Sequence, residues 1–237
     1  MVPAPTTDLH SPEQPVATGK NKASGPLNVL FIGNSFTARN DVPALVAALA
    51  AAAGTTMSHR LISAGGASLR MHWNKGEAPK AIREGGYDYV VLQEQSTLPI
   101  KNAARFHENV RLFDEEIKAA GSKTVLYMTW ARQHAPESQK AIADAYNSIG
   151  DELGAIVVPV GLAWQNFLSK HDKPVLHDRD QSHPTLAGSY LAACVFLAVL
   201  LKAKPLGIES GPAGLDKQDM TALQNAAWEL VGRRTSR

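Results

Sequence analysis

The sequence predicts an α/β fold of three layers, in which a doubly wound, parallel sheet of five strands lies between two layers of helices. From residue 27 onward, short β-branched runs alternate with stretches of helical periodicity, which is the pattern of consecutive βαβ units. A chain of 237 residues that is 44% hydrophobic and 19% charged has the size and composition of one globular domain. We therefore expect a single domain over residues 27–237.

Strands and helices are expected to alternate along most of this domain. The first helix has the clearest boundaries, because Asp41 can cap it, Pro43 suits its first turn and Gly54 can end it. Later helices follow from apolar residues at helical spacing. The expected strands are residues 27–33, 56–63, 87–93, 123–130 and 154–160, and the expected helices lie within 41–54, 106–117, 142–153, 162–168, 186–201 and 220–230.

Charge and hydropathy bear on the classes of partner. A formal net charge of +2 produces no field that would favour nucleic acid as a partner. The longest apolar run, residues 186–201, is shorter than a bilayer span and contains Ser189 and Tyr190, so we interpret it as a core helix and expect no membrane span. The single cysteine, Cys194, lies within this run and is expected to be a buried thiol. The oligomeric state does not follow from the sequence.

Residues 1–26 have a different composition from the rest of the chain. They contain five prolines, several Ser and Thr residues and almost no bulky apolar side chains, which is typical of a disordered tail or linker. Such a tail favours a secreted or periplasmic protein that has lost its leader, but a cytoplasmic protein can begin in the same way. The composition of this segment is therefore compatible with either location.

Candidate functional residues follow the ends of the expected strands. In doubly wound sheets, ligands bind outside the carboxyl ends of the strands. This rule places Ser35, the Gly65–Gly66 pair, residues 93–96, residues 130–134 and the loop 171–183 on one rim of the sheet.

Ser35 is a candidate nucleophile because it follows the first strand directly, in the stretch NVLFIGNSFT. A serine hydroxyl needs a neutral imidazole to take its proton and usually a carboxylate to orient that imidazole. His183 meets the first need, and Asp180, three residues before it in DQSHP, meets the second. Asp178 is close enough in sequence to be an alternative to Asp180.

An acyl-transfer reaction also needs hydrogen-bond donors for the oxyanion. The backbone N–H of Ser35 is one candidate and the N–H of Gly66, in the turn SAGGAS, is another. A side-chain amide from Gln95, or from Gln93, is the candidate for a third donor. By role, these residues make a complete acyl-transfer site, and no cofactor is expected.

Three motifs resemble those of the SGNH (GDSL-type) hydrolases over residues 27–203. The nucleophile block corresponds to GNS at 33–35, the glycine block to GGAS at 65–68 and the Asp-x-x-His block to DQSHP at 180–184. The resemblance implies a flavodoxin-like fold, metal-free ester hydrolysis by a Ser-His-Asp triad, and an oxyanion hole. The third block departs from the family, which usually has Gly-x-Asn-Asp where this chain has LQEQSTLP, so a Gln side chain takes the place of the usual Asn as the candidate third donor.

Several other polar residues have two interpretations. His72 is either a surface-loop residue or a rim residue that contacts substrate or braces the loop, and Gln93 is a second candidate for contact with substrate. Trp130 and Arg132, in TWARQH, either line the substrate pocket or serve as core packing and surface charge, respectively. A metal site is an alternative interpretation of one group of His and Asp residues, whose side chains can ligate a metal but lack the spacing of a metal motif. The group consists of His171, Asp172, His177, Asp178, Asp180 and His183.

The sequence therefore predicts a metal-independent serine esterase that removes short acyl groups, most readily acetyl, from a carbohydrate. An acyltransferase, a lipase or a thioesterase with the same triad is an alternative, distinguished by the acceptor and the acyl chain. A non-catalytic carbohydrate-binding protein of the same fold is a further alternative, since fold alone does not fix function.

Overall fold

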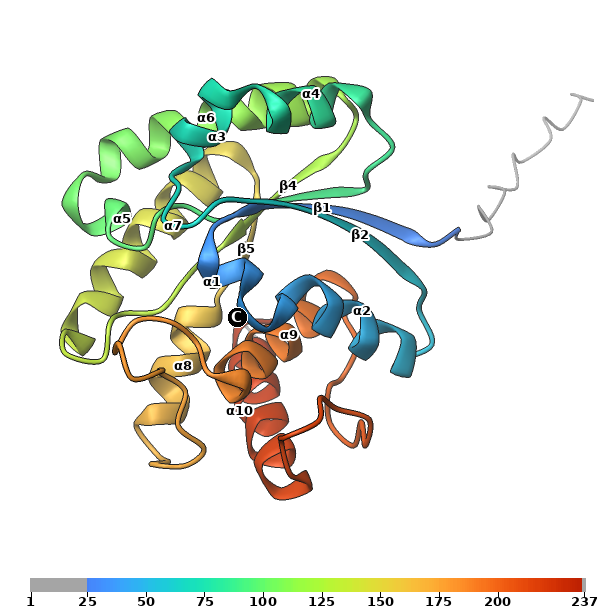
Figure 1. Ribbon diagram of the computed structural model, residues 1–237, viewed down its shortest axis with the longest axis vertical. Helices are drawn as coiled ribbons and strands as arrows, with labels where there is room; N and C mark the ends of the chain where they lie inside the picture. The colour runs from blue at the N-terminus through green and yellow to red at the C-terminus, as the bar shows by residue number, and fades with distance from the viewer. Residues whose placement is uncertain (1–24, 236–237) are drawn as a thin grey trace, which may run out of the picture.

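The computed structural model describes residues 25–235, with the side chains of residues 233–235 left out of the description. The predicted tail, residues 1–26, therefore lies almost entirely outside the described residues. Five parallel strands form one sheet in the order β2-β1-β3-β4-β5 (Figure 1). The strands are β1 (Leu27–Gly33), β2 (Met57–Ser63), β3 (Tyr89–Leu92), β4 (Lys123–Tyr127) and β5 (Ile156–Val158).

Helices cover both faces of this sheet, as Figure 1 shows. One layer contains α2 (Val42–Ala52), α8 (Val160–Leu168), α9 (Leu186–Leu200) and α10 (Lys217–Thr235), and the other contains α3 (Leu69–Lys75), α4 (Glu77–Glu84), α6 (Ala103–Ala119) and α7 (Gln139–Leu153). Each layer buries its own apolar cluster against the sheet. The predicted three-layer α/β/α fold is confirmed.

The strand order places a switch point between β1 and β3. From β1 the chain crosses to β2 on one side, and it then returns to β3 on the other side before continuing to β4 and β5. At such a point the neighbouring connections leave in opposite directions, which opens a crevice at the carboxyl ends of the strands. The short helices α1 (Ser35–Ala38) and α5 (Leu98–Lys101) begin at this rim, and the 3₁₀ turns Arg39–Asp41 and Pro136–Ser138 precede α2 and α7.

The helix boundaries follow the expected capping chemistry. The Asp41 carboxylate accepts the backbone N–H of Ala44 at 3.2 Å, and Gly154 ends α7 with a φ of 63°. The apolar run after residue 185 forms α9, which is buried on nearly all sides between α2, α8 and α10. Among the described residues, no helix has both the length and the apolar character needed to cross a bilayer.

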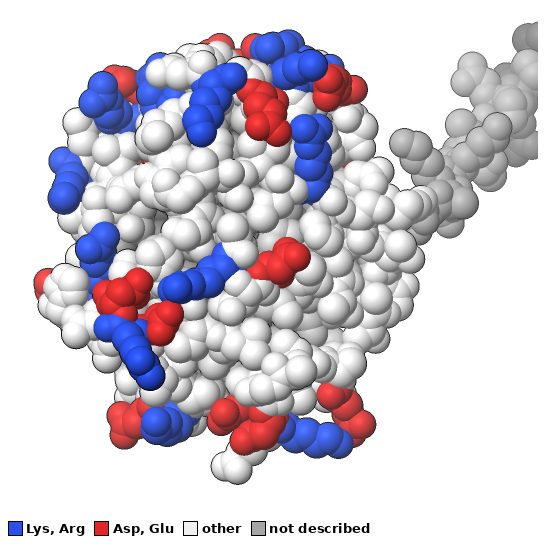
Figure 2. Space-filling view, in the orientation of Figure 1, with Lys and Arg blue, Asp and Glu red and all other residues white. Residues whose placement is uncertain are grey.

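The helices α3 and α4, like the four-residue helices α1 and α5, were not among those expected. They are short, and their apolar residues are interrupted by charged ones, so neither produces a long periodic pattern. The residues around His72 are consequently helical and not a surface loop. Charges of both signs are interspersed on the face seen in Figure 2, in keeping with the small net charge.

Candidate active site

The residues Gly33-Asn34-Ser35 form the tight turn that leads from β1 into α1. A Cβ atom at Gly33 would lie 2.6 Å from Oγ1 of Thr37 and 2.7 Å from Oε1 of Gln93, so only glycine fits at the end of this strand. The chain then turns at once into α1, and the Asn34 side chain caps that helix by accepting the N–H of Phe36 at 3.0 Å. The turn leaves the Ser35 side chain half-buried at the rim, where a ligand can reach it.

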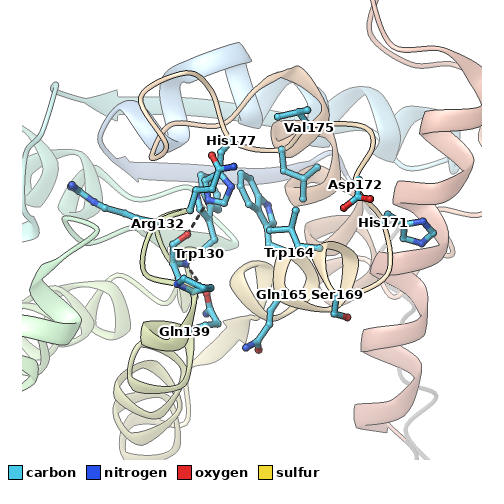
Figure 3. A pocket seen from close by; sticks show the side chains of 15 residues that line it. Trp130, Arg132, Gln139, Trp164, Gln165, Ser169, His171, Asp172, Val175 and His177 are labelled. Carbon is cyan, nitrogen blue, oxygen red and sulfur yellow. Dashed lines mark hydrogen bonds between the residues drawn. The ribbon is translucent and has the colours of Figure 1, made fainter.

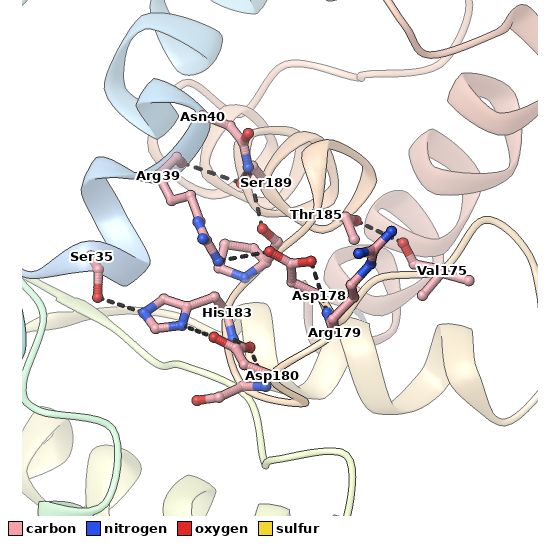
Figure 4. A network of polar contacts seen from close by, with 12 residues as sticks. Ser35, Arg39, Asn40, Val175, Asp178, Arg179, Asp180, His183, Thr185 and Ser189 are labelled. Carbon is pink, nitrogen blue, oxygen red and sulfur yellow. Dashed lines mark hydrogen bonds and ion pairs between the residues drawn. The ribbon is translucent and has the colours of Figure 1, made fainter.

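Ser35 meets His183 across 148 residues of sequence, as Figure 4 shows. The Ser35 Oγ atom lies 2.8 Å from Nε2 of His183. The other ring nitrogen, Nδ1, is hydrogen-bonded to a carboxylate oxygen of Asp180. With the proton on Nδ1 donated to Asp180, Nε2 is free to accept the serine proton, which is the arrangement that general-base activation requires.

Asp180 is held by the backbone of its own loop. Its Oδ1 atom accepts the N–H of His183 at 2.9 Å and that of Ser182 at 3.0 Å. The backbone N–H of His183, together with the His183 side chain and the Ser182 N–H, holds the pKa of the Asp180 carboxyl well below its usual value. Asp178, the alternative considered from the sequence, instead forms an ion pair with Arg39 at 2.9 Å, so Asp180 is the carboxylate that orients His183.

The loop that carries this pair has a fixed backbone. Asp178 donates its N–H to the carbonyl of His183 at 2.8 Å, and Gln181 donates its own to the carbonyl of Asp178 at the same distance. An isolated antiparallel bridge joins His177 to Pro184, and α9 starts soon after. The carboxylate and imidazole are therefore positioned by a closed turn and not by an extended loop.

Two backbone N–H groups near Ser35 are free. Neither Ser35 nor Gly66 donates its N–H to any described residue. Gly66 is exposed and has a φ of 67°, which favours glycine, and the segment around it is tied to the serine turn by the Asn34 amide, which donates to the carbonyl of Ala67 at 3.0 Å. Unpaired donors on two linked turns are what an oxyanion hole needs.

Glu94 is a buried residue of this rim that the sequence analysis missed. Its side chain has no exposed surface, and its Oε1 atom accepts the N–H groups of Leu69 at 3.0 Å and Gln95 at 2.7 Å. Its Oε2 atom accepts the Asn109 amide at 2.9 Å, yet burial still raises the pKa of Glu94. The carboxylate thus joins the end of β3 to the start of α3, just beyond Gly66. The available signal was a charged residue two positions after the end of an apolar strand.

Gln93 and Gln95 have different environments. Gln93 is fully buried, and its Oε1 accepts the N–H of Asn34 at 2.8 Å and the hydroxyl of Thr37 at 2.9 Å, while its NH₂ group donates to the carbonyl of Glu94. This corrects its predicted contact with substrate, because no polar atom of the side chain is left for a ligand. Gln95 remains the predicted third oxyanion donor, since its NH₂ group has no partner among the described residues.

His72 supports the turn that carries Ser35 through a hydrogen bond to its backbone. It is buried in α3, and its Nε2 atom donates to the carbonyl of Gly33 at 2.8 Å. Burial lowers its pKa, which keeps the ring neutral at the carbonyl. The predicted contact with substrate is therefore corrected to bracing, the other role considered for it.

Trp130 is a packing residue that links the two halves of the site. It is 2% exposed, stacks on Phe36 and on Trp164, and donates its indole N–H to the carbonyl of Ser182 at 3.0 Å. Core packing, the other role considered for it, is therefore observed, and its contact with substrate stays a prediction. Arg132 borders a cavity of about 470 Å³ that Trp130 and Trp164 also line (Figure 3).

The candidate metal ligands do not share one centre. Asp180 and His183 bond to each other, Asp178 pairs with Arg39, and His177 donates to the carbonyl of Ala131 at 3.0 Å. His171 and Asp172 line the 470 Å³ cavity instead. Within residues 25–235, no three such side chains are grouped to hold a metal ion.

Comparisons with solved structures find a fold shared with hydrolases. No family model and no curated protein matches the sequence. A solved protein from Slackia heliotrinireducens, described as a putative SGNH hydrolase, is 26% identical, with a TM-score of 0.66, over 74% of this chain and 100% of that one. A DUF4886 family protein from Bacteroides uniformis is 22% identical, with a TM-score of 0.74, over 89% and 96%. An acetylxylan esterase from Geobacillus stearothermophilus is 18% identical, with a TM-score of 0.59, over 73% and 94%.

Proposed function

We propose that this chain, which has the fold of the SGNH hydrolases, hydrolyses short acyl esters, and that Ser35, His183 and Asp180 carry the reaction. The supporting observation is the continuous hydrogen-bonded path from the Ser35 hydroxyl through His183 to Asp180, beside two unpaired backbone N–H groups. A turn residue without catalytic function would need neither the imidazole at 2.8 Å nor the free donors.

The reaction proceeds in two acyl transfers. The Ser35 hydroxyl attacks the ester carbonyl while His183 takes its proton, and the N–H groups of Ser35 and Gly66 bind the oxyanion. His183 then returns the proton to the departing alcohol, which leaves an acyl-serine. Water, deprotonated by the same imidazole, releases the acid, and Asp180 keeps the ring oriented through both steps.

The proposed substrate is an acetylated carbohydrate. Support comes from the shared fold of the acetylxylan esterase, whose name identifies an acetyl ester of a polysaccharide as its substrate. Hydrolysis, as opposed to transfer to an acceptor, is proposed because the Ser35 side chain lies half-buried at the rim of the sheet, where water can reach an acyl group attached to it.

The test is turnover of 4-nitrophenyl esters from acetate to octanoate by the wild type and by Ser35→Ala and His183→Ala. We expect acetate to be the best substrate and each variant to lose at least about a thousandfold in kcat. Ser58→Ala is the matched control, since it removes an exposed hydroxyl from the opposite, amino end of β2. Wild-type activity in Ser35→Ala would refute the assignment, and faster acetyl transfer to an added sugar than to water would identify a transferase.

A further inference from the structure

A cavity of about 310 Å³, with two arginines in its lining, lies beside the predicted oxyanion hole. Its lining begins one residue after Ala67, whose carbonyl accepts the Asn34 amide next to Ser35, and it includes the candidate third donor. The cavity is therefore close enough for a group attached to the reacting ester to enter it. Its lining residues are Ser68, Arg70, Gln95, Leu98, Arg105 and Asn109.

The hydrogen-bond acceptors on this wall are already used. The side-chain oxygen of Gln95, Oε1, accepts the backbone N–H groups of Thr97 and Leu98 and the hydroxyl of Thr97, at 2.9–3.1 Å. The Asn109 carbonyl oxygen accepts the Nε–H of Arg70 at 2.9 Å, and the Ser68 hydroxyl oxygen accepts a backbone N–H at 3.3 Å. These contacts also fix which end of each amide faces the cavity.

Several donors of the same wall have no partner among the described residues. The terminal nitrogens of Arg70, the guanidinium of Arg105 and the NH₂ group of Gln95 make no hydrogen bond to any described residue. No carboxylate of the described chain lies within 4.0 Å of either arginine, whereas Arg39, Arg60, Arg83 and Arg111 all have one. The nearby Glu94 carboxylate, which is fully buried, offsets at most one of the two positive charges.

We propose that this cavity binds a carboxylate of the substrate, so that the preferred substrate is an acetyl ester of an acidic sugar. A neutral sugar hydroxyl both donates and accepts, whereas this wall offers mainly unpaired donors because its acceptors are already engaged. A carboxylate only accepts, and it matches the planar fork of a guanidinium. The inference rests on the proposed esterase function and adds the charge of the alcohol half of the substrate to it.

The test compares two acetyl esters that differ only at one position, methyl glucuronoside acetate and methyl glucoside acetate. The readout is the ratio of their kcat/KM values, which cancels any general loss of activity. We expect a ratio of about ten or more for the wild type, the size of one charge-assisted hydrogen bond. In Arg70→Gln and Arg105→Gln the ratio should fall towards one.

Two further variants separate charge at the cavity from charge nearby. Arg105 is exposed, so Arg105→Glu keeps the fold intact and should lower the ratio below one. Lys101→Gln removes an exposed cation of α5 that does not line the cavity and should keep the wild-type ratio. A wild-type ratio near one, with both esters hydrolysed, would overturn the proposal while leaving the esterase function standing.

A carboxylate on the acyl half of the substrate is the other source of the same chemistry. A preference for 4-nitrophenyl hemisuccinate over 4-nitrophenyl butyrate that disappears in Arg105→Gln would move the carboxylate to that half and overturn the assignment to the alcohol. If no ester is hydrolysed, titration of the Ser35→Ala variant with methyl glucuronoside decides: saturable binding that Arg105→Gln weakens supports the subsite, and no binding refutes it.

Discussion

The ring of Phe36 stacks on the indole of Trp130, with 4.8 Å between ring centroids and 5° between the planes. Phe36 follows Ser35 directly, and the same indole donates to the carbonyl of Ser182, directly before His183. One tryptophan therefore sets the position of the serine turn relative to the histidine loop.

Trp130→Phe should lower kcat by about tenfold with little change in KM. Phenylalanine keeps the stack on Phe36 but loses the hydrogen bond to Ser182. That bond contributes about 1 kcal/mol and helps to place His183, so its loss should raise the activation barrier. Steady-state kinetics with 4-nitrophenyl acetate provide the measurement. Trp228→Phe, on α10, is the control, and an unchanged kcat in Trp130→Phe would contradict this positioning role.

Gly33→Ala should destabilise the protein by about 1–3 kcal/mol, because the new methyl group overlaps Thr37 and Gln93 behind the nucleophile. Chemical denaturation measures the free energy of unfolding. Gly65→Ala is the matched control, since a Cβ there meets nothing within 4 Å and the backbone does not need a positive φ. Equal stability of the two variants would show that the turn can relax.

Glu94→Gln should reduce kcat by about tenfold. The glutamine oxygen can still accept the N–H groups of Leu69 and Gln95, but its NH₂ group then faces the NH₂ group of Asn109, so one hydrogen bond is lost. The double variant with Asn109→Asp restores a donor opposite an acceptor. Recovery of kcat in that double variant would confirm positioning by the Glu94–Asn109 pair, and failure to recover would contradict it.

The free energy of unfolding should fall as the pH drops below about 6.5, the ordinary pKa of histidine. Burial lowers the pKa of His72 and of His177 in the folded protein. At pH values between these lowered pKa values and the ordinary pKa, the unfolded chain therefore binds more protons than the folded one. The raised pKa of Glu94 acts with the opposite sign, but Glu94 is present in both the wild type and His72→Gln, so its effect cancels in the comparison. His72→Gln, which can still donate to Gly33, should therefore lose less stability than the wild type between pH 8 and pH 5.5, and an equal loss would exclude His72 as a contributor.

Local sequence rules were sufficient for the sheet and for most helices. The expected strands overlap all five observed ones, because a strand buried on both faces is a continuous apolar run such as Val-Leu-Phe-Ile in β1. Caps and terminal glycines located α2 and α7. The helices α3 and α4 escaped because eight residues or fewer give too few turns for a periodic signal.

At the site, the residue types were predictable but their environments were not. DQSHP contains both Asp180 and His183, so the contact between their side chains could be inferred from the sequence. The roles of Gln93, Glu94 and Gln95 depend on the exact end of β3 and on which face each side chain occupies, and a difference of one residue moves a side chain from the interior to the rim. His72 and Trp130 likewise depend on contacts with residues distant in sequence.

The contacts between Asp180 and His183 are local to the turn from residue 177 to residue 184. The turn as a whole is also held from outside, because Trp130 donates to the carbonyl of Ser182 and Gln133 donates to the carbonyl of Gln181. These outside contacts, and not the turn itself, set the distance from Nε2 of His183 to the Ser35 hydroxyl. Grafted onto another α/β scaffold, the turn would bring an oriented imidazole but not the anchors that place it beside a serine.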